Sequence, residues 1–109
     1  PVILGDGAQS MDFIHVSDIV RANILAMESD IDCEIINLGS GKSTSIADLA
    51  RIIIKKFGTK IQPIFEARDV MVSERRADTF KAKDLLNFST KKQFSEGIGE
   101  VISEIKNKY

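Results

Sequence analysis

Short apolar runs bounded by turn residues predict the strands of this chain. Residues 2–4 form one such run ahead of a turn signal at residues 5–7, and residues 12–16 alternate weakly between polar and apolar. Residues 34–38 are a compact β-branched run that stops at a glycine, so a buried strand is expected there. Residues 60–66 contain a proline, which places the last predicted strand at a sheet edge or a bulge.

Apolar positions three and four residues apart predict four helices, and the first two carry clear end signals. Ser17 or Asp18 can cap the first helix, which runs to about residue 29. Ser45 forms a capping box with Asp48 at the start of the second helix, and Gly58 supplies its C-terminal stop.

The remaining sequence predicts a short helix followed by the clearest one. Asp78 can cap the short helix, which ends near Leu86, and Asn87 can take the left-handed conformation after it. The last helix carries one apolar stripe, formed by Phe94, Ile98, Val101, Ile102 and Ile105. The order of elements predicts an α/β fold, with a small sheet of about three strands, four helices and right-handed crossovers between parallel strands.

Composition narrows the possible partners of the chain. Fifteen basic and sixteen acidic residues leave a net charge of -1, which gives no reason to expect nucleic-acid binding. The longest apolar run, residues 52–54, is far too short to cross a bilayer. A single thiol, Cys33, and a single imidazole, His15, make a poor metal site. We therefore expect a soluble, cytoplasmic protein without a membrane partner or a metal.

Residues 39–44, Gly-Ser-Gly-Lys-Ser-Thr, look like the end of a phosphate-binding loop because they follow a predicted strand and precede a predicted helix. The full signature needs a glycine five residues before the Gly-Lys pair, and that position is Ile36. Thr44 likewise stands where a dinucleotide-binding fingerprint would place its third glycine. The segment is therefore expected to serve as a tight turn with open N–H groups at a helix N-terminus.

Three stretches, in chain order, carry a family resemblance. Residues 5–19 are similar to the motif G-D-G-x-Q-x-R-D-[FY]-[IV]-[HY]-V-x-D-[IV], and residues 37–50 resemble N-[IL]-G-[ST]-G with the helix after it. Residues 77–98 resemble A-D-x-S-K-A-K-x-L-L-G-[FW] and a final E-G-[IL] helix. Together they resemble the extended short-chain dehydrogenase/reductase family, specifically its NAD-dependent nucleotide-sugar epimerases and dehydratases, of the UDP-glucose 4-epimerase kind.

The resemblance implies that residues 1–109 are the C-terminal, substrate-binding part of a Rossmann-type epimerase or dehydratase. In that family this region follows a glycine-rich cofactor loop and a catalytic Tyr-x-x-x-Lys pair, and the sequence contains neither. Tyr109 is the only tyrosine and ends the chain, so it cannot be that catalytic residue. We therefore expect no catalysis and no cofactor binding by this chain alone, with NAD(P) held by the dinucleotide-binding domain of an intact parent protein.

The resemblance also suggests where a nucleotide-sugar would bind. The family grips the diphosphate with arginines, whose planar fork of donors matches phosphate oxygens. One of these arginines stands where this chain has Met11, so only weak binding is expected. Arg75 or Arg76 is the favoured second arginine, with Gln9 nearby, and Arg68 is a further candidate. The alternative is a solvated basic loop without a ligand.

Two aspartates of the first motif are expected to have architectural roles. Asp18 can cap a helix, and Asp12 can hold its own turn. The competing hypothesis for the whole chain is a non-enzymatic fragment or a small, oligomerising binding module. In either case the predicted strand at residues 34–38 would offer an unpaired edge, which predicts a homo-oligomer or a complex with the N-terminal half.

Overall fold

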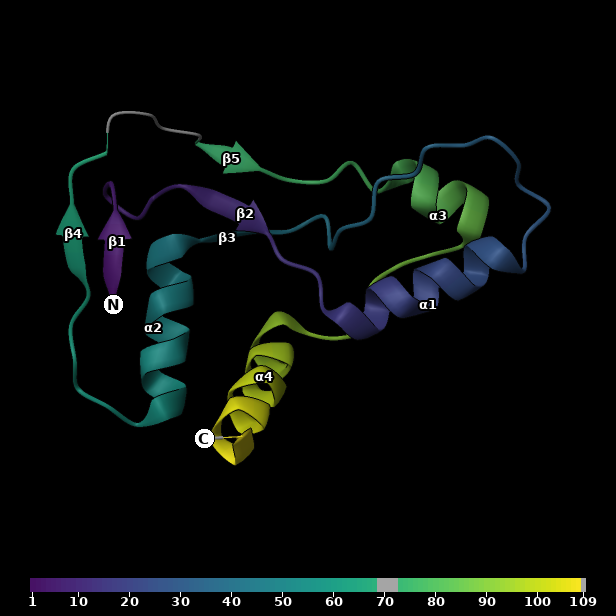
Figure 1. The fold of residues 1–109 in the computed structure, drawn as a ribbon. Coiled ribbons are helices and arrows are strands. Elements are labelled where there is room, and N and C mark those ends of the chain that lie inside the picture. Colours follow the sequence, from purple (N-terminus) through teal and green to yellow (C-terminus); the bar gives the residue numbers. More distant parts are fainter. Residues whose placement is uncertain (69–72, 109) are drawn as a thin grey trace.

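The computed structural model describes residues 1–68 and 73–108, and these ranges contain four helices and five short strands. Figure 1 shows them spread along one long axis. This composition confirms the predicted α/β class. In chain order the elements are β1 (Val2–Leu4), β2 (Ser10–Asp12), α1 (Val16–Met27), β3 (Ser43–Ser45), α2 (Ile46–Phe57), β4 (Ile64–Glu66), β5 (Glu74–Arg75), α3 (Phe80–Leu86) and α4 (Phe94–Lys108).

The strands form two small sheets instead of one. β1 and β4 pair in parallel. In the second sheet β2 lies at the centre, antiparallel to β3 and parallel to β5. The strand expected at residues 12–16 therefore lies nearer the N-terminus, at Ser10–Asp12, because the following residues leave the sheet to start α1. Residues 66–76, which have no clear apolar period and are expected to form a loop, contain β5, and residues 69–72 lie outside the described residues.

The caps of α2 confirm the sequence prediction, whereas the cap of α1 does not. The Ser45 hydroxyl accepts the N–H of Asp48 at 3.0 Å, and Gly58 takes a left-handed φ of 70° at the other end of α2. In α1 the capping residue is His15, whose Nδ1 accepts the N–H of Ser17 at 3.3 Å. Ser17 and Asp18 therefore lie inside the first turn of α1, and Asp18 is free to bind elsewhere.

The start of α3 lies one residue later than expected. Thr79 occupies the cap position without a side-chain bond, while the Asp78 carboxylate accepts the N–H of Phe80 at 2.9 Å. Asn87 adopts the predicted left-handed conformation after Leu86, with a φ of 48°. A side-chain bond thus supports the start of this short helix, and the left-handed backbone of Asn87 ends it.

The strand predicted at residues 34–38 is wrong: these residues belong to an extended connection between α1 and β3 that pairs with no strand. Ile36 and Leu38 instead pack against the apolar cluster formed by Ala22, Ala82, Leu86 and Phe88. Ile35 is 87% exposed. The β-branched pattern reports burial of alternate side chains, and here helices α1 and α3 provide that burial without a ladder of backbone bonds.

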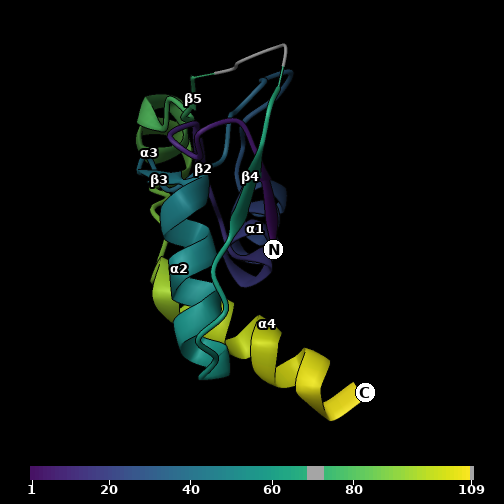
Figure 2. The same ribbon diagram turned by 90° about the vertical axis from the view of Figure 1, so that its left-hand side faces the viewer.

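The molecule is a thin slab with little interior. Its principal extents are 50 × 36 × 18 Å, and Figure 2 shows the slab edge-on. One face of α1 is exposed along its whole length, through Val16, Val20, Ile24 and Met27, and Met27 is 85% exposed. Exposed apolar faces are typical of surfaces that bind another polypeptide, a membrane or a ligand.

Helix α4 contains two glycines, and only one of them lies in close contact with another element. A Cβ on Gly97 would lie 2.9 Å from Cδ2 of the His15 ring, which caps α1. A Cβ on Gly99 would approach only the flexible end of Lys56, at 3.2 Å from Nζ. Gly97 therefore permits a close helix–ring contact that no other residue allows, while Gly99 has no comparable constraint.

This difference predicts opposite effects of two alanine substitutions in α4. Gly99→Ala should raise the free energy of unfolding by up to ~1 kcal/mol, the usual advantage of alanine over glycine inside a helix. Gly97→Ala should lose that gain and destabilise the chain, because its methyl group displaces the capping ring of His15. Thermal and urea unfolding of both variants measures the difference. Equal stabilisation by both would show that α4 does not pack on His15.

Candidate functional site

The centre of the candidate site is the strand β2, where the family motif and the predicted basic loop come together. Met11 pairs with Thr44 of β3 on one side and with Arg75 of β5 on the other. Side chains of paired residues in adjacent strands project from the same face of a sheet. Met11, Thr44 and Arg75 therefore form one row across the sheet, with the guanidinium of Arg75 next to the position where the family carries an arginine.

Gln9 lies one residue before β2 and is buried, with only 8% of its surface exposed. Its Nε2 donates to the carbonyl oxygen of Leu4 at 2.6 Å. Its Oε1 is buried and accepts no hydrogen bond from any residue that the structure describes. Gln9, which is predicted to contact the ligand, is therefore part of the packing between β1 and β2. Its Oε1 is a buried acceptor without a hydrogen bond from the described residues.

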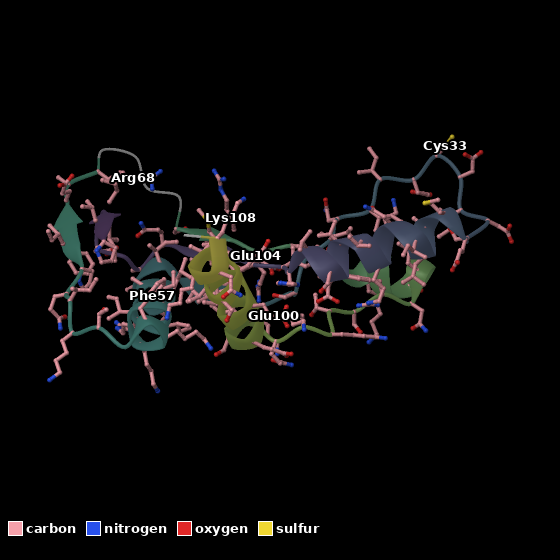
Figure 3. The ribbon with its side chains drawn as sticks, turned by 60° about the horizontal axis from the view of Figure 1, so that its bottom comes forward. Cys33, Phe57, Arg68, Glu100, Glu104 and Lys108 are labelled. Atoms are coloured by element: carbon pink, nitrogen blue, oxygen red, sulfur yellow. The ribbon has the colours of Figure 1, made fainter. Side chains whose placement is uncertain are left out.

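The three candidate arginines lie on exposed positions. Arg75 ends β5 and Arg76 follows it, and Arg76 forms a loose ion pair with Glu74 at 3.6 Å. Arg68 lies beside the end of β4, at the opposite end of the molecule from Cys33 (Figure 3). The structure thus brings Arg75 to Met11 and Gln9 to the same sheet, while Arg68 stands apart with the β1–β4 pair.

Asp12 ties three distant segments together. Its carboxylate accepts the N–H groups of Ser40 and Gly41 at 2.8 Å each, the N–H of Ala77 at 3.3 Å, and the Ser40 hydroxyl at 2.5 Å. Burial acts to raise the pKa of Asp12, but these hydrogen bonds outweigh it and hold the pKa below its ordinary value. A Cβ on Gly39 would lie 2.6 Å from the Asp12 carboxylate, so the loop approaches it closely only as glycine.

The Asp12 contacts explain the loop that looks like a phosphate-binding motif. Its backbone N–H groups at Ser40 and Gly41 point at the Asp12 carboxylate, an anion supplied by the chain itself. The open N–H groups expected from the sequence are therefore occupied. This turn therefore does not fit the pyrophosphate of a dinucleotide, which would need free donors there.

Asp18 holds the start of α4 against α1. Its carboxylate accepts the N–H groups of Lys91 and Lys92, both at 3.0 Å, and pairs with Arg21 at 2.9 Å. Burial acts to raise the pKa of Asp18, but the backbone bonds and the Arg21 guanidinium lower it overall. Arg21 in turn stacks over Phe88, 4.7 Å from the ring centre. The architectural role predicted for Asp18 holds, although it joins two segments instead of capping a helix.

His15 and Cys33, the single imidazole and the single thiol of the chain, lie in different parts of the fold. His15 caps α1, and its Nε2 lies 3.5 Å from the Glu100 carboxylate of α4. Cys33 is exposed in the connection after α1. Within residues 1–68 and 73–108 no group of histidine, cysteine and acidic side chains could hold a metal ion, and no helix is long and apolar enough to span a membrane.

A polar pocket opens beside β2 and β3, and sequence reasoning missed it. Its volume is about 250 Å³, and the stacked rings of Phe13 and Phe94, 5.3 Å apart, form one wall. The pocket is rich in hydroxyl and amino groups, a mixture that could hold an anionic, hydroxylated ligand. Its polar lining consists of Ser40, Lys42, Ser43, Thr44, Thr90, Lys92 and Gln93.

Comparison with known proteins agrees with the motifs placed on this sheet. The sequence model of the NAD dependent epimerase/dehydratase family matches residues 1–39. A putative UDP-glucose 4-epimerase of Methanocaldococcus jannaschii is 35% identical over 108 residues, and a UDP-glucuronate 4-epimerase of Thermodesulfobacterium geofontis is 36% identical over 105. The chain belongs to the NAD-dependent epimerase/dehydratase family.

The fold of this family member matches solved structures over nearly its whole length. The UDP-glucose 4-epimerase of Thermotoga maritima, solved with UDP-glucose, superposes with a TM-score of 0.91 at 31% identity, over 98% of this chain and 35% of the other. The UDP-glucuronic acid 4-epimerase of Bacillus cereus, solved with NAD, gives 0.86 at 30% identity. The chain spans about a third of the length of the curated relatives it matches.

The two bound aspartates predict a loss of stability in acid. The folded-state pKa values of Asp12 and Asp18 lie below the ordinary value of 3.8, so their contribution is complete above that pH and is lost as the pH falls through the lowered values. The free energy of unfolding should therefore decrease steeply below about pH 4. Urea unfolding followed from pH 7 to pH 2.5 (roughly the range of carboxylate titration) measures this dependence.

Asparagine variants of Asp12 and Asp18, with one control, identify the carboxylates responsible for the acid dependence. Asp12→Asn should destabilise the chain at neutral pH by about 1–3 kcal/mol, since charged hydrogen bonds are lost, and should flatten the acid dependence. Asp84→Asn, in an exposed position of α3, should leave both unchanged. An acid dependence that survives in Asp12→Asn and in Asp18→Asn would assign it to other carboxylates.

Proposed function

We propose that this chain is the nucleotide-sugar-binding part of an NAD-dependent sugar epimerase or dehydratase. The observation that carries the proposal is the superposition with a UDP-glucose 4-epimerase holding UDP-glucose, over 98% of this chain and only 35% of that protein. The region that matches would correspond to the C-terminal part of such an enzyme. The remaining part would supply the dinucleotide, the Tyr-x-x-x-Lys pair and the hydride transfer.

In this proposal the described residues bind and orient the substrate. The row formed by Thr44, Met11 and Arg75 would face the diphosphate, with the Arg75 guanidinium as donor. Arg76 would assist from the position after the strand end, and Gln9, whose side chain is buried, would support the sheet from nearby. Because a thioether at position 11 cannot pair with phosphate, the affinity would be low.

A second candidate function is that of a small, oligomerising binding module without catalytic activity. The exposed apolar face of α1 favours it, because a free chain would keep Val16, Val20 and Met27 in water. The two candidates differ in what they bind. A substrate-binding part binds a nucleotide-sugar, whereas an oligomerising module associates only with protein.

Restoring the missing arginine tests the proposed substrate site. Met11→Arg should strengthen binding of UDP-glucose by ~1–3 kcal/mol, the value of a charged hydrogen bond, and Arg75→Ala should weaken it. Isothermal titration of the wild type and both variants measures the affinities, and titration with NAD should give no stoichiometric binding. Met11→Leu serves as the matched control, because it changes the side chain without adding charge.

Two results would contradict this prediction. If Met11→Arg folds but gains no affinity over Met11→Leu, position 11 does not face the phosphate. If NAD binds stoichiometrically with micromolar affinity, the chain contains a cofactor site that the proposal assigns to another part of the enzyme.

The exposed face of α1 predicts association of the free chain. Burying Val20, Ile24 and Met27 against a second copy, or against a polypeptide carrying the dinucleotide-binding part, would remove their apolar surface from water. Light scattering should therefore give a mass above that of the 12.1 kDa chain. The double variant Val20→Lys, Met27→Lys should shift the mass toward the monomer without unfolding, because both side chains already lie at the surface.

A stable, well-folded monomer at high concentration would contradict the association. Arg51→Lys, at an exposed position of α2, is the control for nonspecific effects of placing a lysine on the surface. Association that persists unchanged in the double variant would move the contact to another face.

A further inference from the structure

We propose that the Lys42 ammonium binds the anionic group of the ligand in this chain. It would replace the positive charge that Met11 cannot supply. The inference rests on the proposed nucleotide-sugar binding and adds to it Lys42, the lysine of the Gly-Lys pair, which lines the polar pocket. It concerns the diphosphate, the one strongly anionic group of such a substrate, and it gives the pocket beside β2 and β3 a ligand.

The ends of β2 and β3 place Lys42 near the candidate site. Met11 is opposite Thr44 in this antiparallel pair, and the paired register ends at Asp12 opposite Ser43. Phe13 and Lys42 are the next residues on either side of that end, and both line the same polar pocket. A cation therefore lies just beyond the end of the strand pair that holds the uncharged position 11.

The charges around the pocket favour Lys42 over its neighbour. The Lys92 ammonium lies between two carboxylates, 3.2 Å from Glu96 and 2.7 Å from Glu100, and this pairing raises its pKa. None of the ion pairs formed within residues 1–68 and 73–108 involves Lys42. Lys92 thus brings its own counter-ions, whereas the charge of Lys42 is available to an incoming anion.

The chemistry of the pocket suits a phosphate held by an ammonium. Lysine binds phosphate as a point charge on a flexible stem with three donors, so it reaches an oxygen from a neighbouring strand position without the planar fit that arginine needs. Hydroxyl groups of Thr44 and Thr90 line the same space and can donate to further oxygens. Ser43 has a different task, since its hydroxyl donates to Glu74 at 2.6 Å.

Titration of the wild-type chain and three lysine variants with UDP-glucose tests the proposal. Lys42→Ala should weaken binding about tenfold or more, and Lys42→Arg should retain most of it, because a charged hydrogen bond is lost in the first and kept in the second. Lys60→Ala removes the same charge from an exposed position after α2 and should leave the affinity unchanged. The slope of log Kd against log salt should also decrease in Lys42→Ala only.

A second measurement locates the ligand without relying on affinity. In amide NMR spectra of the wild-type chain, UDP-glucose should shift the signals of Thr44 and Thr90, and inorganic pyrophosphate alone should shift the same signals. Circular dichroism and thermal unfolding of each variant establish that it is folded.

The outcomes separate this inference from the function on which it rests. If the wild type binds UDP-glucose and Lys42→Ala binds it equally well, or as well as Lys60→Ala does, Lys42 does not contact the anion while the proposed function stands. If the shifts fall only around Arg75, the ligand lies on that side of Met11 and the inference is overturned. If the wild type binds neither UDP-glucose nor pyrophosphate, both the inference and the proposed function fail.

Discussion

Two aspartates, a buried Asp18 and a half-buried Asp12, hold together segments that have little apolar core to join them. Asp12 collects the N–H groups of Ser40, Gly41 and Ala77, and Asp18 collects those of Lys91 and Lys92. A carboxylate that accepts several N–H groups is satisfied internally, and each bond to a charged group contributes more than a neutral one. In a slab with so small an interior, these carboxylates do the joining that a larger core would otherwise provide.

The Asp12 contacts also position the candidate site. By binding Ala77, Asp12 fixes the end of β5, and so sets Arg75 beside Met11. By binding Ser40 and Gly41, it fixes the turn that leads into Lys42 and β3. Arg75 beside Met11 and Lys42 before β3 are thus both anchored by one acidic group. The site and the fold depend on the same interaction, which means that disturbing Asp12 would affect ligand binding through position as well as stability.

The thin shape of the chain is consistent with a part that works against another polypeptide. Helix α1 packs one side against α3, but its other apolar side is exposed to solvent. Helix α4 closes a different side, where Gly97 meets His15 and Lys106 lies over the ring of Phe57. Figure 1 shows α4 below the sheet and α1 extending away from it, so the two faces are separate.

The sequence by itself determined the four helices, the caps at Ser45 and Gly58, the turn at Asn87 and the family, because these depend on residues close along the chain or on motifs in a fixed order. Only the tertiary structure decided what residues 34–38 do, which carboxylate fills the glycine turn, and which residues pair with Met11. Apolar periodicity reports that a side chain is buried, but the partner that buries it, or the N–H that a carboxylate accepts, comes from segments tens of residues away.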